Sequence, residues 1–93
     1  MQDLNDMLYF AEVVARGGFT AAGRALGIPK SRLSRRVSDL EAQLGVRLLQ
    51  RTTRKLSLTE VGEAYLRHCQ AMRESAQAAA DTVAQVQTTP RGT

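Results

Sequence analysis

The chain has 93 residues, 43% of them hydrophobic, and its 13 lysines and arginines against 9 acidic residues give a net charge of +4. This length allows one small hydrophobic core. Cys69 is the only cysteine and His68 the only histidine, so an intrachain disulfide is excluded and we expect no metal site and no cofactor.

The positive charge is concentrated in the middle of the chain. Residues 1–15 hold three acidic and no basic side chains, residues 16–58 hold ten basic and two acidic ones, and residues 59–93 hold three basic and four acidic ones. Such a concentration favours one surface patch that attracts phosphates. A membrane surface is less favoured because no basic helix with exposed aromatic residues is present. With no signal pattern and no apolar run of about 20 residues, we expect a cytoplasmic protein.

Apolar side chains at helical spacing predict a first helix that begins near Leu4 and ends at Gly17-Gly18. Asp3 suits its N-terminal cap. The apolar stripe consists of Leu4, Met7, Leu8, Ala11, Val14 and Ala15, widened by Phe10 and Val13.

A short second helix is expected over Ala21–Leu26, with Thr20 as its cap and Gly27 as its end. Gly23 and Gly27 are small enough for two helices to cross closely there. Pro29 suits the turn or the first position of a third helix.

The third helix is predicted from about Lys30 to Leu44, with Gly45 at its end. Its buried stripe, about 60° wide, consists of Leu33, Val37, Leu40 and Leu44. Its exposed positive residues are all in the first two turns and are all candidate DNA contacts: Lys30, Arg32, Arg35 and Arg36. This polarity is typical of a recognition helix that enters the major groove with its N-terminal end, and a merely solvated charged face is the less favoured interpretation.

Two short strands joined by a basic tip are predicted next. Leu48 and Leu49 precede the polar segment 51–55, and Leu56 and Leu58 follow it. We interpret this hairpin as a wing whose Arg51, Arg54 and Lys55 reach phosphates or the adjacent minor groove. Thr53, in the same polar segment, is a further candidate DNA contact. An ordinary basic surface hairpin is the alternative.

The last predicted element is a single helix of roughly 27 residues, about 40 Å long, with Thr59 as its cap. A heptad pattern runs through Gly62, Tyr65, Cys69, Met72, Ala76, Ala79, Val83 and Val86. We therefore predict a dimerisation helix that uses Tyr65 and the six residues after it in this pattern, and a solitary alanine-rich helix is the alternative. Cys69 is interpreted as part of this seam rather than as a redox switch.

Together these elements resemble the DNA-binding domain of LysR-type transcriptional regulators. The resemblance rests on FAEVVARGGFTAAGRALGI, SRLSRRVSDLEAQLGVRLLQR and TRKLSLTEVG, in this order, and covers about residues 4–62. It implies a mainly α fold, in which a winged helix-turn-helix of three helices and a short β-hairpin (residues 1–58) is followed by a long linker helix (59–87). Residues 88–93 would form a hinge toward an effector domain, of a type that senses small molecules, beyond this chain.

The resemblance also implies partners and contacts. The partners are double-stranded DNA, as an interrupted palindrome, and a second copy paired antiparallel through the linker helix, with a higher oligomer in the intact protein. A small-molecule effector would act only through the absent C-terminal domain. Thr20 would meet a phosphate, Arg51 and Arg54 would serve the wing, and five residues of the third helix would face the groove: Lys30, Ser31, Arg32, Ser34 and Arg35.

DNA binding has two alternatives from other classes of function. A protein-interaction module could dock the basic face on an acidic partner and use the coiled-coil helix, and it would show no salt-dependent DNA binding. An enzyme is not expected, because Ser31, Ser34, Ser38 and Ser57 lack an activating histidine or carboxylate and no glycine-rich phosphate loop is present.

Overall fold

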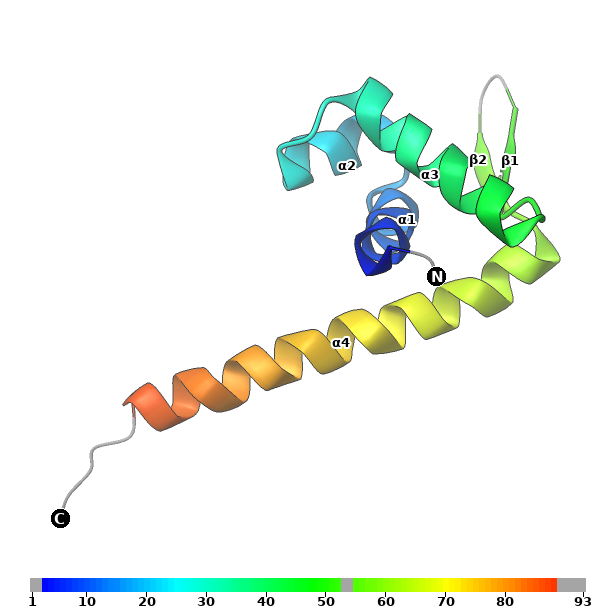
Figure 1. Cartoon of the computed structure of the whole chain (residues 1–93). Coiled ribbons are helices and arrows are strands. Elements are labelled where there is room, and N and C mark those ends of the chain that lie inside the picture. Colours follow the sequence, from blue (N-terminus) through cyan, green and yellow to red (C-terminus); the bar gives the residue numbers. More distant parts are fainter. Residues whose placement is uncertain (1–2, 53–54, 89–93) are drawn as a thin grey trace, which may run out of the picture.

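The structure is a computed structural model that describes residues 3–52 and 55–88. Its elements are α1 (Leu4–Arg16), α2 (Phe19–Leu26), α3 (Lys30–Leu44), β1 (Leu49–Arg51), β2 (Leu56–Leu58) and α4 (Glu60–Thr88). Helices α1 to α3 and the hairpin form one body, and α4 passes α1 and projects far beyond it (Figure 1). The predicted mainly α winged helix-turn-helix with a long C-terminal helix is confirmed. The proposed hinge falls almost wholly on residues 89–93, outside the described residues.

The core lies where the three short helices meet α4 and the hairpin. Phe10, Val13, Leu33 and Leu40 are fully buried. The predicted stripe of α3 is confirmed, but that of α1 was placed too far to one side, because Leu4 is 57% exposed. Helix α1 packs against α2, α3 and α4 at once. The middle of α1 is therefore covered on several sides, including the side that carries Phe10 and Val13, while Leu4 at its start is not covered.

Helix α2 begins two residues earlier than predicted. Gly18 is its N-cap, with no side-chain cap, and the Ala22 N–H donates to the Gly18 carbonyl at 3.2 Å. Thr20 is therefore a first-turn residue, and the prediction that it caps the helix was wrong. Gly27 ends the helix as predicted, in a left-handed conformation with φ 69°, but it makes no close crossing.

The close approach predicted for α2 is made by Gly23. A Cβ atom there would lie 2.8 Å from the carbonyl oxygen of Ile28, in the turn that leads to α3. Because real Cβ atoms do not approach an oxygen so closely, the turn can pass over α2 at this spot only while residue 23 is glycine.

The wing is an antiparallel pair in which Leu49 faces Leu58 and Arg51 faces Leu56. One carboxylate oxygen of Glu41, near the end of α3, accepts hydrogen bonds from the backbone N–H groups of Leu48 and Leu49, at 2.8 and 3.1 Å. This carboxylate satisfies two buried donors and joins the base of the wing to the recognition helix.

Helix α4 begins under the wing. The hydroxyl of Thr59 accepts a hydrogen bond from the Gly62 N–H at 2.9 Å, which confirms the predicted cap, and donates to the carbonyl oxygen of Arg47 at 2.6 Å. Gly62 is buried against the carbonyl of Leu48. The cap therefore links the start of α4 to the strand that begins the wing.

The heptad pattern of α4 has two different roles along its length. Cys69 is fully buried within its own chain, and the ring centroid of Tyr65 lies 5.9 Å from that of Phe10. This half of the pattern packs on α1, so the fully buried Cys69 has no surface left for a second copy and its predicted seam role is corrected, whereas that of the partly buried Tyr65 stays a prediction. Met72 is partly buried, and the last four predicted seam residues are exposed: Ala76, Ala79, Val83 and Val86.

Burial raises the pKa of the Cys69 thiol from 9.0 to about 11. Near neutral pH this lowers the reactive thiolate fraction by about 100-fold, and burial also blocks access. We expect Ellman's reagent to label the native chain at least about 100-fold more slowly than the chain in denaturant. The absorbance of the released product, followed at one pH, measures the labelling rate in both states. Equal labelling rates in the native and the denatured chain would place Cys69 on the surface.

Within residues 3–52 and 55–88, even the longest helix, α4, is too polar to span a membrane.

Candidate nucleic-acid interface

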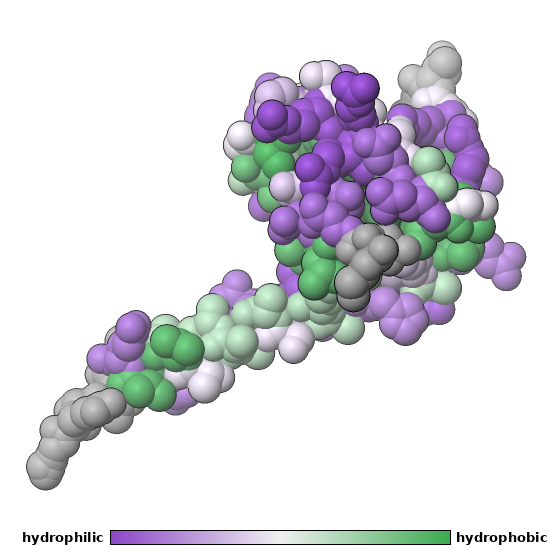
Figure 2. Space-filling view, viewed as in Figure 1, coloured by the Kyte–Doolittle hydropathy of each residue, from purple (hydrophilic) through white to green (hydrophobic). Residues whose placement is uncertain are grey.

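Helix α3 separates its apolar and basic residues on opposite sides. Leu33 and Val37 are fully buried, while Lys30, Arg32 and Arg35 are exposed. Figure 2 shows hydrophilic side chains gathered over the part of the body that α2 and α3 form, and paler and hydrophobic residues along the projecting part of α4. The outward face of α3 is therefore polar, basic and open to a large partner.

Arg36 behaves differently from the other cations of α3. Its Nε donates to Oδ1 of Asp6 at 2.6 Å and its Nη2 donates to Oδ2 of Asp3 at 2.9 Å. The guanidinium also lies 5.6 Å from the ring centroid of Tyr9, and the hydrogen bond with Asp6 is the main reason that its pKa is raised. Asp6 is only 4% exposed. The Arg36 guanidinium therefore joins α3 to α1, and its predicted DNA contact stays a prediction.

The remaining cations of α3 have no such partners. No carboxylate among the described residues lies within 4.0 Å of Lys30, Arg32 or Arg35. No ion pair within residues 3–52 and 55–88 therefore compensates their charge, which is available to attract phosphate groups. Ser31 is exposed beside them, and Ser34 is partly buried.

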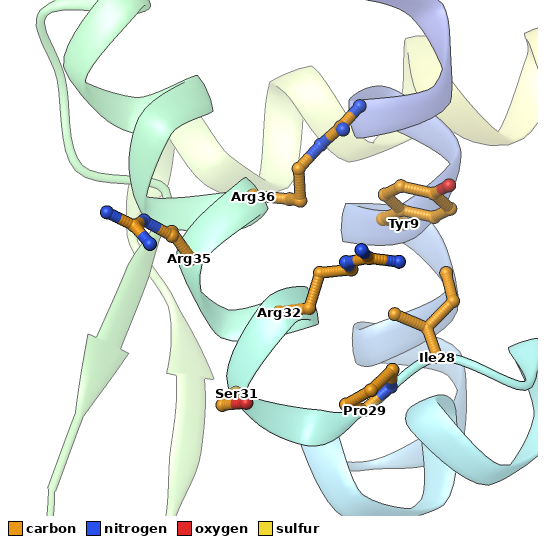
Figure 3. A pocket seen from close by; sticks show the side chains of 7 residues that line it. All are labelled: Tyr9, Ile28, Pro29, Ser31, Arg32, Arg35 and Arg36. Carbon is orange, nitrogen blue, oxygen red and sulfur yellow. The ribbon is translucent and has the colours of Figure 1, made fainter.

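Arg32 and Arg35 leave α3 in different directions (Figure 3). Arg32 extends toward Tyr9 of α1, Arg35 points away from Tyr9, and Ser31 lies on the side of α3 away from α1. The hollow between α1 and α3 is lined by residues of α1, of the turn that contains Pro29, and of the first two turns of α3. Arg32 and Arg35 would therefore contact different parts of any partner that covers α3.

A second, shallower hollow lies where α2 meets the start of α3. Thr20, Arg24 and Lys30 line it, which brings the predicted phosphate contact of Thr20 next to the recognition helix. Arg24 was missed as a candidate in the sequence. It is exposed in the last turn of α2, and its position one turn after Thr20 on the same helix is the signal that could have identified it.

The wing contributes Arg51, whose guanidinium lies 4.8 Å from the ring centroid of Phe19 at the start of α2. This contact orients Arg51 while leaving it exposed, so it remains a candidate for a phosphate contact. Lys55 is exposed as well. Thr53 and Arg54, two of the predicted contacts, lie outside the described residues.

The described His, Cys, Asp and Glu side chains form no group of three that could hold a metal ion.

Comparison with known proteins agrees with this geometry. Residues 4–63 match the family "Bacterial regulatory helix-turn-helix protein, lysR family". An HTH-type transcriptional regulator of Xanthomonas campestris pv. campestris is 50% identical over 90 residues, which are 97% of this chain and 26% of that protein. The chain spans about a quarter of the length of the curated relatives that it matches.

Two solved structures are similar over most of the chain. The BenM DNA-binding domain in complex with catB site 1 DNA has a TM-score of 0.82 and 26% identity, covering 96% of this chain and 99% of that one. Full-length AphB, a virulence activator of Vibrio cholerae, has a TM-score of 0.80 and 34% identity, covering 87% of this chain and 28% of that one. This chain therefore belongs to the lysR family of bacterial regulatory helix-turn-helix proteins and contains its DNA-binding domain.

Proposed function

We propose that this chain recognises operator DNA through the first two turns of α3, with support from α2 and the wing. The observation that carries the proposal is the exposed face of α3, where Lys30, Arg32 and Arg35 have no carboxylate partner within the described part of the chain. Ser31 and Ser34 add hydrogen-bonding groups on the same helix, and Thr20 and Arg51 supply phosphate contacts from its neighbours. The proposal includes no catalytic step and places the protein in the bacterial cytoplasm.

The affinity is expected to depend strongly on salt. Phosphate contacts release counterions, so a protein that makes about six or more of them loses roughly a thousandfold or more in affinity between about 50 and 200 mM salt. Fluorescence anisotropy with a labelled duplex, selected from a random library for binding to this chain, measures this dependence. An affinity that does not change with salt would favour the protein-interaction module instead.

We further propose that two copies pair through the projecting half of α4. Val83 and Val86 are 59% and 55% exposed, and with Ala76 and Ala79 they continue the heptad pattern past the end of the core. Small alanines permit a second helix to approach closely. Such a dimer would carry two recognition helices, which suits an interrupted palindrome with half-sites in successive major grooves.

The proposed pairing is tested on the double variant Val83→Asp/Val86→Asp. Two carboxylates in an apolar seam oppose association, so sedimentation should show a monomer where the unmodified chain is a dimer. The control is Gln77→Asp/Asp81→Asn, because these side chains already hydrogen-bond to each other on the helix surface. If the double variant still sedimented as a dimer, the two copies would not pair through Val83 and Val86.

We assign residues 1–58 to DNA binding, 59–87 to the linker helix and 88–93 to a hinge. The relatives extend well beyond the length of this chain, and the effector site and any higher oligomer are proposed for that further part of the protein.

A further inference from the structure

The hollow between α1 and α3 differs in chemistry from the rest of the basic face. Its volume is about 890 Å³, and its lining includes the apolar residues Ile28 and Pro29 together with Tyr9. The two arginines nearest to Tyr9 have different roles, because Arg36 is occupied by Asp3 and Asp6 whereas Arg32 has no ion-pair partner among the described residues. The hollow thus combines an apolar lining with two guanidiniums that have no ion-pair partner among the described residues, those of Arg32 and Arg35, and of these Arg32 extends toward Tyr9.

Tyr9 is held in place at this hollow. The Arg36 guanidinium lies 5.6 Å from its ring centroid and is itself fixed by Asp6. The Tyr9 hydroxyl makes no hydrogen bond within residues 3–52 and 55–88, and it lies on the side of α3 toward which Arg32 extends (Figure 3). A hydroxyl donor and a guanidinium are therefore available on one flank of the recognition helix.

A helix lying in the major groove has one sugar-phosphate backbone along each flank, and base edges are reached only by side chains that point outward into the groove. Arg32 extends sideways toward α1, whereas Arg35 points away from that flank. This geometry favours Arg35 for base readout and places Arg32 on the flank along which one backbone would pass.

We propose that Arg32 and Tyr9 bind one phosphodiester of the DNA strand that runs beside α1, while the adjoining deoxyribose packs on Ile28 and Pro29. The inference rests on the proposed function and deepens it. Arg32, which the resemblance places facing the groove, becomes a positioning residue that fixes the register of α3 in the groove. Tyr9 becomes a DNA contact that lies outside the helix-turn-helix.

Equilibrium binding of the full chain tests this proposal, with the selected duplex and with a scrambled duplex of the same composition. Arg32→Ala should lower the affinity for both duplexes by a similar factor, about five- to tenfold, and reduce the slope of log K against log salt by about 1. Tyr9→Phe should weaken both by about two- to threefold without a change of slope, because no charge is lost. Arg67→Ala, an exposed arginine of α4, is the matched control and should leave both affinities unchanged.

A neutral methylphosphonate placed at single backbone positions identifies the phosphate. At one position per half-site the substitution should weaken the unmodified chain, and the same substitution should cause no further loss in Arg32→Ala. The proposal is overturned if Arg32→Ala weakens only the selected duplex with an unchanged salt slope, which is base readout, or weakens neither. If the unmodified chain binds no duplex in a salt-dependent way, the proposed function itself fails, so the two failures are distinguishable.

Discussion

Replacing Arg35 with alanine is expected to weaken binding to a selected duplex by about 1–3 kcal/mol, or about five- to 150-fold, and to weaken binding to a scrambled duplex much less. Arg35 is exposed, lacks a carboxylate partner among the described residues and points away from the flank that Arg32 occupies. A guanidinium in this position can donate two hydrogen bonds to O6 and N7 of a guanine. Losing them leaves base-edge acceptors unpaired in the specific complex alone.

Mobility shifts with both duplexes measure the difference. Arg35→Lys is the matched variant, because it retains the charge but loses the planar pair of donors, and it should keep the nonspecific affinity while losing most of the discrimination. Equal losses on both duplexes for Arg35→Ala would show that Arg35 serves a phosphate and that sequence is read elsewhere.

Gly62→Ala is expected to cause the largest loss of stability of any glycine-to-alanine change among the described residues. A Cβ atom at residue 62 would lie 2.1 Å from the carbonyl oxygen and 2.9 Å from the carbonyl carbon of Leu48, and 3.1 Å from the hydroxyl of Thr59. Two of these neighbours are backbone atoms, so α4 must move away from the wing. We expect a net loss of about 2 kcal/mol or more, because strain exceeds the gain of roughly 1 kcal/mol from removing a helical glycine.

Thermal unfolding followed by circular dichroism measures this loss, which should lower the melting temperature by roughly 10 °C for a domain of this size. Gly18→Ala is the control, because a Cβ atom there meets nothing within 4 Å and costs only the small N-cap preference for glycine. If both variants melted at the same temperature, the packing of α4 against Leu48 would not be as close as the structure has it.

The bounds of α3 were predictable because local signals determine them. Pro29 precedes it, Gly45 ends it in the left-handed conformation with φ 74°, and its apolar period leaves one buried side. The wing was predictable for a similar reason, since leucines enclose a polar segment. The start of α2 was not predictable, because the Gly18 carbonyl accepts its first backbone hydrogen bond and no capping side chain marks that position.

The roles of two candidate contacts could not be predicted from the sequence. Arg36 is an arginine on the same flank of the helix as Arg32, and only the fold brings Asp6, 30 positions earlier, to within 2.6 Å of it. Cys69 belongs to an unbroken heptad pattern, but such a pattern does not determine whether the helix that packs on Cys69 is α1 of the same chain or α4 of a second chain. Both distinctions arise from tertiary packing rather than from periodicity.

The central claim is that the outward face of α3 is the DNA-binding surface, and amide chemical-shift mapping with an unlabelled selected duplex tests it most directly. The account predicts that the largest shifts occur over residues 30–35, with smaller shifts near Thr20 and in the wing, and that the side of α3 formed by Leu33 and Val37 stays packed. Shifts confined to α4, with residues 30–35 unchanged at saturating duplex, would contradict it.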